Sequence, residues 1–324
     1  MSFHPFVSAK ADSADATRVN ASNWNAAHVG GYNYLVNPGH EIAQRGAGAI
    51  TANNAYTCDR HQIILAGTDT LSWTREGTTK MTNSLYSSKC VVVVGTGAGA
   101  THHREVLTIA DGYHGLLGKA VTFSANRSTA TAAAVRAYIK TDGTGGTTTF
   151  SGYHTGGGSF ELLTVSLATV PTDATYVEVG TAFAASCTAY EDNDALGIGS
   201  SSALDLYASL VPAEEWSRAM RYFEVHGYGN TSTNSGQPRY YGPSVASDGI
   251  NLPIGFAVRK AVAMPTMTKA GTWSASGNAS GQPSAADPTP HGYTFAESTG
   301  AVITTSVNVY PDTSDDTITA AADP

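Results

Sequence analysis

The chain has 324 residues and a mass of 33.5 kDa, enough for about two or three compact units with their own cores. Its formal net charge is −8, its pI is near 5.6, and no basic stripe is visible, so we expect no nucleic-acid binding. Charged residues make up only 14% of the chain, whereas glycine contributes 34 residues and threonine and serine are abundant. This composition favours threonine-rich strands joined by glycine turns over solvated helices.

The three cysteines are Cys58, Cys90 and Cys187, and their mutual spacing matches neither a metal site nor a redox motif. An odd number cannot form a closed set of disulfides, so we interpret them as small buried residues of a chain made in a reducing compartment. Residues 1–6 lack the basic and apolar stretches of a signal peptide. No apolar run approaches the length of a membrane span, so no membrane insertion is expected.

Residues 1–33 differ in composition from the rest of the chain. They are small and polar, and Ser22 can cap a short helical turn that carries Trp24 and His28. A segment of this kind cannot bury itself, so we expect it to become ordered against a partner.

Short strand patterns repeat from residue 34 to about residue 210. They cover residues 55–65, 70–75, 90–94, 104–109, 119–124, 133–140, 161–167 and 176–179. Glycine-rich turns separate them and no helical pattern intervenes. We therefore predict a two-sheet sandwich of jelly-roll type over residues 34–210.

One helix stands out in this β-rich sequence, at residues 212–225. Trp216, Ala219, Met220 and Phe223 recur with the helical period, and Pro212 suits the first position. The helix is too short to be stable alone, so we expect this stripe to be buried between two β units. On that expectation Trp216→Ala costs about 3–5 kcal/mol of stability.

Strand patterns resume after the helix, at residues 256–258, 266–268, 301–309 and 317–319. Several prolines limit the remaining segments to turns or sheet edges. We therefore predict that residues 211–324 form the helix together with a smaller C-terminal β subdomain.

Six segments, in this order, resemble one group of tailed-phage virion proteins. Residues 15–28 resemble a segment near the N-terminus of phage tail and fibre proteins, and residues 35–46 resemble the opening of phage carbohydrate-binding jelly rolls (galactose-binding-like domains). The other four are similar to later elements of such domains: residues 56–60, 117–124, 214–224 and 318–324. The chain departs from the pattern at His40, where an aromatic residue is usual, and at Cys58, which replaces a small residue.

The resemblance implies a virion fibre or spike, on the tail or on the head, including that of a gene-transfer agent. It implies binding to a host cell-surface polysaccharide during adsorption, usually as a homotrimer, with residues 1–33 attached to other virion proteins. Two alternatives remain: a purely structural capsid-decoration or fibre protein, and a glycan-cleaving depolymerase. We predict no enzyme, because no nucleophile elbow, Ser/His/Asp order or paired carboxylates stand out in the sequence.

Sugar binding needs an aromatic ring to stack on the apolar side of a pyranose and planar polar groups for its hydroxyls. Along residues 135–140 every second residue is polar or aromatic, as on a binding face. For each candidate, the alternative is an ordinary solvent-exposed face or, for Trp73, the core. The candidates are Trp73 with Arg75, Tyr113 with His114, Arg136 with Tyr138, Tyr153 with His154, and Tyr240 with Tyr241.

A strand pattern runs into Gly95-x-Gly97-x-x-Ala100, which matches part of a dinucleotide-binding fingerprint. No helix follows it, because residues 101–109 already form a strand pattern. A flexible loop between strands is the favoured interpretation, and no organic cofactor is expected.

Residues 191–194 are acidic, and Asp192 and Asp194 are the candidate ligands for a structural Ca²⁺. A solvated turn is the favoured alternative. His102 and His103 also suggest a metal, but neighbouring residues on a strand point to opposite faces.

Overall fold

The structure is a computed structural model that describes part of the chain. The described residues are 33–82, 84–199, 212–226, 240–242, 250–257, 259–261, 264–269, 273–276, 284–297, 307–311 and 318–321. The predicted attachment segment 1–33 lies almost entirely outside them and stays a prediction. Among the described helices, none has the length and apolar character needed to cross a membrane.

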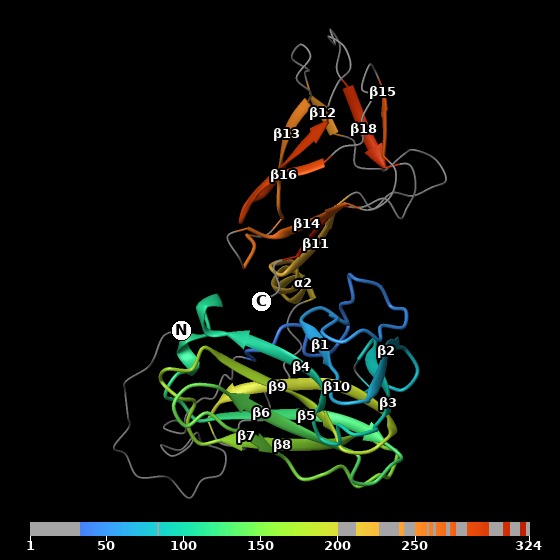
Figure 1. Cartoon of the computed structure of the whole chain (residues 1–324), viewed down its shortest axis with the longest axis vertical. Helices are drawn as coiled ribbons and strands as arrows, with labels where there is room; N and C mark the ends of the chain where they lie inside the picture. Colours follow the sequence, from blue (N-terminus) through green and yellow to red (C-terminus); the bar gives the residue numbers. More distant parts are fainter. Residues whose placement is uncertain are drawn as a thin grey trace, which may run out of the picture.

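The N-terminal half of the chain is a sandwich of two antiparallel five-stranded sheets, as the sequence predicted (Figure 1). In spatial order, the first sheet contains β1 (His61–Ile64), β4 (Thr101–Thr108), β9 (Tyr176–Phe183), β6 (Val135–Thr141) and β7 (Thr148–Phe150). The second contains β2 (Thr70–Glu76), β3 (Ser87–Val93), β10 (Cys187–Ile198), β5 (Val121–Thr129) and β8 (Glu161–Leu167). Apart from the consecutive pairs β6–β7 and β2–β3, neighbouring strands in each sheet are distant in sequence, as in a jelly roll.

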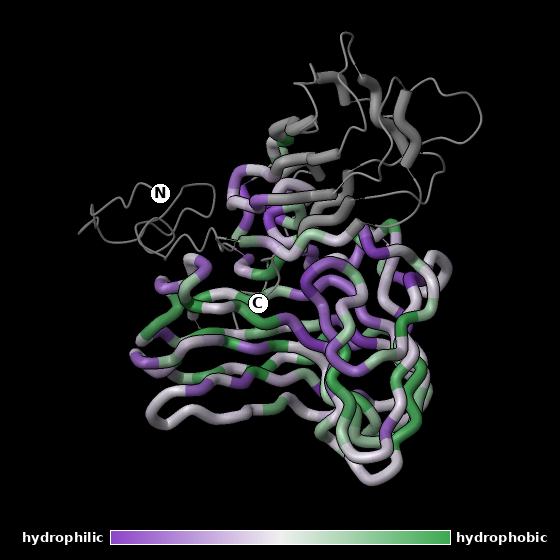
Figure 2. Tube along the Cα trace, turned by 45° about the horizontal axis from the view of Figure 1, so that its top comes forward, coloured by the Kyte–Doolittle hydropathy of each residue, from purple (hydrophilic) through white to green (hydrophobic). Residues whose placement is uncertain are grey.

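The core lies between the two sheets and follows from the alternation of each strand. In β4 every second residue is buried, from Thr101 to Leu107. Trp73, Phe123 and Phe183 fill the space between the sheets and are 0% exposed. Hydrophobic stretches of chain run along the strands of the sandwich, with hydrophilic stretches between them (Figure 2).

A polar layer interrupts this apolar core. On the second sheet, register places Ser88 and Arg127 on either side of Glu191. On the first sheet it places His103 opposite Thr181. These side chains face one another across the sandwich, and each is at most 1% exposed.

The longest strand, β10, was missed by the sequence analysis. It contains Glu191–Asp194, which the acidic composition favoured as a turn. A β-bulge between Asp192 and Ala195, with Asn193 at a φ of 49°, lets successive polar residues be buried rather than alternate. The solvated-turn interpretation was therefore wrong, because these side chains are buried in the sandwich, where Glu191 contacts His103, Asp192 contacts Ser84 and Asp194 contacts Arg127.

The predicted helix is present as α2 (Pro212–Met220), which is shorter than expected. It ends at Met220 because Phe223 begins β11 (Phe223–His226), which pairs with β19 (Ile318–Ala321). In Figure 1, α2 lies between the sandwich and the C-terminal strands. The backbone N–H of Ala261 donates to the carbonyl of Arg221 at 3.1 Å, which links the end of α2 to the C-terminal half.

The predicted stripe is buried only in part: Ala219 and Phe223 are 0% and 8% exposed, whereas Trp216 is 45% exposed. Ala219 packs with Tyr222 and with Val36 of the sandwich. Arg218 donates to backbone carbonyls of the segment at residues 33–34, each at 3.3 Å. Hydrogen bonds to the backbone of this segment therefore help to orient the helix, which the apolar stripe could not reveal.

The described residues of the C-terminal half form three antiparallel three-stranded sheets. The first is β11–β19–β14, where β14 spans Thr266–Lys269. The second contains β12 (Tyr240–Gly242), β18 (Val307–Pro311) and β15 (Trp273–Ser276). The third contains β13 (Ile250–Gly255), β17 (Gly292–Glu297) and β16 (Ser284–Thr289). The expected strand at 256–258 is absent from its described residues, because β13 ends at Gly255.

Candidate binding face

The first sheet turns one face away from the core, and we call this the open face. Along β6 it carries Arg136, Tyr138 and Lys140, which alternate with core residues as predicted. Register places Tyr138 opposite Gly180 of β9 and Lys140 opposite Glu178. Strands β4 and β1 continue the same face on the far side of β9.

Glu178 is the charged centre of the open face. The Arg104 guanidinium donates to one carboxylate oxygen, and the Tyr138 hydroxyl donates to the other at 2.7 Å. Lys140 Nζ and His102 Nδ1 each lie 3.8 Å from this carboxylate. The Glu178 side chain is 2% exposed, so it acts mainly by holding the more exposed cations in place.

Two pKa shifts fix the protonation of the neighbouring groups. Burial, and secondarily the Glu178 carboxylate, raises the pKa of Tyr138 well above its ordinary value. Burial also lowers the pKa of His102 from its ordinary value. At neutral pH, Tyr138 is therefore a hydrogen-bond donor, and His102 is a neutral ring whose centre lies 4.4 Å from that of the tilted Tyr138 ring.

A pocket of about 260 Å³ opens beside Glu178. Two tyrosine rings and several planar polar groups line it: Tyr56, Gln62, Arg104, Val106, Lys140, Tyr176 and Glu178. Arg104 donates to Gln62 Oε1 at 2.9 Å, so the pocket wall is already organised by hydrogen bonds. Aromatic rings beside fixed polar groups suit the apolar and hydroxyl faces of a sugar ring.

A second aromatic group lies at the β7 side of the open face. The Arg136 guanidinium lies 3.5 Å from the ring centre of Phe150 and 5.0 Å from that of Tyr153. Tyr153 is 43% exposed, and the Phe150 ring lies 6.2 Å from that of Tyr138. The open face therefore presents aromatic surface on both sides of its charged centre.

Of the ten predicted sugar-binding residues, the structure brings three together on this face: Arg136, Tyr138 and Tyr153. Trp73 instead lies in the core, 0% exposed, and its indole N–H donates to Ser88 at 2.7 Å. Its expected partner Arg75 packs over the ring of Tyr86 on the second sheet, at 4.2 Å. Both residues belong to β2 of the second sheet, whereas the open face belongs to the first sheet.

The other predicted pairs lie apart from this pocket. Tyr113 packs against the core, and its hydroxyl lies 3.5 Å from that of Tyr222, while His114 is exposed at the start of a short 3₁₀ helix, His114–Leu116. His154 is 1% exposed and accepts the backbone N–H of Gly156 at 2.9 Å. Tyr240 and Tyr241 belong to β12, but their side chains lie outside the described residues and stay predictions.

Five residues that line the pocket were not predicted from the sequence: Tyr56, Gln62, Arg104, Tyr176 and Glu178. Alternation along β4 and β9 contained a signal for three of them. The missing information was strand order, because only the sheet places β1, β4, β9 and β6 side by side.

The proposed calcium ligands Asp192 and Asp194 are buried within β10 rather than in a loop. Asp194 accepts two hydrogen bonds from Arg127, at 2.5 and 2.9 Å. Asp192 accepts from the Ser84 hydroxyl and the Met81 N–H, each at 2.8 Å. Both carboxylates thus already have protein partners, and a calcium ion there stays a prediction of the sequence.

The glycine-rich motif at residues 95–100 is a loop between β3 and β4, as favoured. The backbone N–H groups of Gly95 and Gly97 both donate to Asp69, at 2.8 and 3.0 Å. A Cβ at Gly97 would lie 2.3 Å from the carbonyl oxygen of Ala66. The loop therefore folds around the Asp69 carboxylate. This carboxylate accepts the backbone N–H groups that would bind a pyrophosphate in a dinucleotide-binding loop.

No protein-family profile matches this chain, and no curated protein matches it. Among solved structures, it is similar to the enzymatically active domain of tailspike protein 4 of bacteriophage CBA120, with a TM-score of 0.34 and 12% identity. That match covers 52% of this chain and 21% of the tailspike chain.

The chain is also similar to the CBM22-1 xylan-binding domain from Paenibacillus barcinonensis, with a TM-score of 0.33 and 10% identity. This match covers 48% of this chain and 96% of that domain. A third similar structure is the CBM22-1 and GH10 modules of a Clostridium thermocellum xylanase, with a TM-score of 0.36 and 8% identity over 52% of this chain and 29% of that one. At these scores, the fold assignment rests on this chain's own sheet topology.

Proposed function

We propose that this chain binds a polysaccharide through the open face of the first sheet and does not cleave it. The observation that carries the proposal is the pocket beside Glu178, where Tyr56 and Tyr176 accompany the fixed donors Arg104 and Lys140. Tyrosine rings stack on pyranose faces, while guanidinium, ammonium and amide groups hydrogen-bond to hydroxyls. Hydrolysis normally needs two carboxylates, and Glu178 is the single carboxylate among the described residues that line the pocket.

Titration calorimetry of the full chain against soluble polysaccharides, including host envelope glycans and xylan, tests this proposal. We expect Tyr176→Ala to weaken binding by about tenfold or more without changing thermal stability. The matched control is Tyr190→Ala, because Tyr190 is a partly exposed tyrosine on β10 of the opposite sheet. Equal binding by both variants, or no binding by the wild-type chain to any polymer, would overturn the proposal.

The wider role we propose is that of a virion fibre or spike that adsorbs to the host through this surface. This proposal is supported by six segments that resemble phage virion proteins and occur in the same order along the chain, together with the binding face described above. Modest affinity at one site then gains avidity from a homotrimer or an array, with residues 1–33 joining other virion proteins.

Deletion of the protein from the particle distinguishes this role from a purely structural one. Intact particles that fail to adsorb support receptor binding, whereas unstable particles support the structural alternative. Incubation of the chain with host polysaccharide addresses the third possibility, because released oligosaccharide would reveal a depolymerase.

A further inference from the structure

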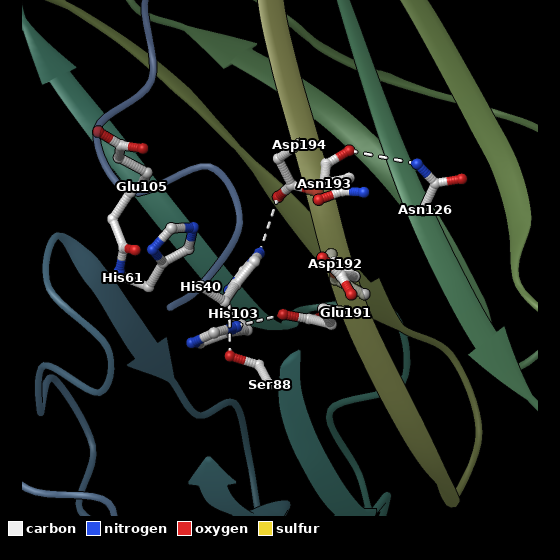
Figure 3. Close-up of polar contacts among 12 residues, drawn as sticks. His40, His61, Ser88, His103, Glu105, Asn126, Glu191, Asp192, Asn193 and Asp194 are labelled. Atoms are coloured by element: carbon white, nitrogen blue, oxygen red, sulfur yellow. Dashed lines mark hydrogen bonds and ion pairs between the residues drawn. The ribbon is translucent and has the colours of Figure 1, made fainter. Parts of the chain in front are cut away.

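Three histidines from separate segments meet inside the sandwich, at one end of the polar layer (Figure 3). His40 comes from the segment before β1, His61 begins β1, and His103 lies on β4. The His40 ring lies 4.2 Å from that of His61 and 6.0 Å from that of His103. All three residues are at most 2% exposed, so this cluster is sealed from solvent.

Cys58 completes a set of ligand-type atoms with two of these histidines. Its Sγ lies 3.4 Å from His40 Nδ1. One ligand atom from each of His40, Cys58 and His61 lies within 4.8 Å of the other two. Tetrahedral zinc with ordinary bond lengths separates its ligand atoms by about 3.3–3.6 Å, so the His40–Cys58 pair already has the required spacing.

The polar contacts of His40 Nε2 and His61 Nδ1 leave the other ring nitrogen of each histidine available to a metal. His40 Nε2 lies 3.3 Å from Asp194 Oδ2, and that carboxylate is itself held by Arg127. His61 Nδ1 lies 3.4 Å from the carbonyl oxygen of Asp59. Metal-binding histidines usually donate their second ring N–H to such a carboxylate or carbonyl.

His61 Nε2 is the clearest sign of a missing ligand. It is buried and has no hydrogen-bond partner among the described residues. Because His61 Nδ1 is placed to donate to the carbonyl oxygen of Asp59, Nε2 is the ring nitrogen left with a lone pair. A buried ring nitrogen normally has a partner, because leaving one unsatisfied costs about 1–3 kcal/mol.

The charges of the polar layer also favour a cation. Glu191 and Asp194 face the single guanidinium of Arg127. Although burial opposes ionisation, His103 and Arg127 hold the pKa of Glu191 at about 2, so it stays ionised at neutral pH. These two carboxylates therefore attract a positive charge at the position of His40, whether it is carried by a ring proton or by a metal ion.

We propose that His40, Cys58 and His61 bind one divalent transition-metal ion, of which zinc is the best fit. Two imidazole nitrogens and one thiolate match the borderline-soft preference of zinc. The Ser88 hydroxyl, 3.0 Å from His40 Nδ1 and 3.6 Å from Cys58 Sγ, lies at hand for the fourth position. The ion is structural, because no described ligand group of the site is open to solvent.

A second possible ligand set, His40 with His103 and Glu191, is less favourable. Both ring nitrogens of His103 already have partners, since Nε2 contacts the Thr57 hydroxyl at 2.7 Å and Nδ1 contacts Glu191. The proposed site instead joins the segment around residue 40, the turn at residues 58–61 and β3. The bound ion would therefore connect the segment around residue 40, which precedes β1, to both sheets.

The test is metal analysis of the full chain purified after expression with added zinc and dialysis. We expect about one zinc per chain in the wild-type protein and a loss of most of it in Cys58→Ser and His61→Gln. Cys187→Ser is the matched control, because Cys187 is also a buried free cysteine but lies outside the cluster. It should retain the zinc.

Cobalt substitution of the wild-type chain gives a readout that does not depend on the folding of variants. A tetrahedral site with one thiolate produces a sulfur-to-cobalt charge-transfer band and intense visible bands. Absence of the charge-transfer band, or zinc content no higher in the wild type than in Cys58→Ser, overturns the proposal and leaves a metal-free hydrogen-bonded cluster.

Discussion

The sandwich contains two clusters of similar residues that differ in exposure. In the polar layer, the side chains of Arg127 and Asp194 are 1% and 3% exposed. On the open face, those of Arg104 and Glu178 are 22% and 2% exposed. The same type of ion pair thus serves two purposes. A buried arginine must find all its hydrogen-bond partners within the protein, whereas a partly exposed arginine can also bind a ligand.

Replacing the arginine in each cluster is the strongest test of this difference. Arg127→Met leaves Asp194 buried without its main partner, so we expect a loss of about 3–5 kcal/mol in the free energy of unfolding. Arg104→Met should cost about 1–2 kcal/mol, since Tyr138 and Lys140 still contact Glu178. Urea denaturation measures both, and equal losses would remove the distinction between the clusters.

Acid should destabilise the chain through the polar layer. Glu191 has a pKa near 2 when folded, against an ordinary value of 4.5. Its contribution is complete above pH 4.5 and is lost as the pH falls towards 2, because the unfolded state then binds the proton more readily. In a chelating buffer, Glu191→Gln should reduce the dependence of the unfolding free energy on pH between pH 4.5 and 2.

Glu105→Gln is the control for the acid experiment. Burial raises the pKa of Glu105 to about 7, so below pH 4.5 this group is protonated in both states and contributes no slope. Its own effect has the opposite sign: stability declines as pH rises from 4.5 to 7, and the substitution should remove that decline. A wild-type-like slope in Glu191→Gln would contradict the assignment to Glu191.

Buried residues of the open face should contribute to stability as core residues do. Tyr138 is 0% exposed and donates to Glu178, so Tyr138→Phe should cost about 1–2 kcal/mol in thermal or urea unfolding. Tyr176 lines the pocket, and Tyr176→Phe should change stability by less than about 0.5 kcal/mol. A larger stability loss in Tyr176→Phe would mean that the pocket wall is structural.

Trp216→Ala should have the smallest effect, below about 1 kcal/mol, because this side chain is 45% exposed. Tyr222→Ala should cost several times more in the same urea titration, since its ring is 2% exposed and lies 3.9 Å from the Arg60 guanidinium. A large loss in Trp216→Ala would restore the original prediction that this residue is buried between the two β units.

Much of the sandwich was predictable because its signals are local. Alternation identified most strands, and it correctly assigned Arg136, Tyr138 and Lys140 to the face opposite Val135, Ala137 and Ile139. Strand β10 was missed, since an acidic run favours a turn unless distant partners such as Arg127 and His103 neutralise it.

The sequence by itself therefore determined the mainly β class, the sandwich and the approximate helix, because each depends on periodicity within a few residues. Only the tertiary structure decided the binding face and the proposed metal site. Tyr56, Arg104 and Tyr176 are separated by dozens of residues and meet through strand order. His40 and Cys58 likewise meet only when two sheets enclose them, because burial and mutual distance are properties of the folded chain.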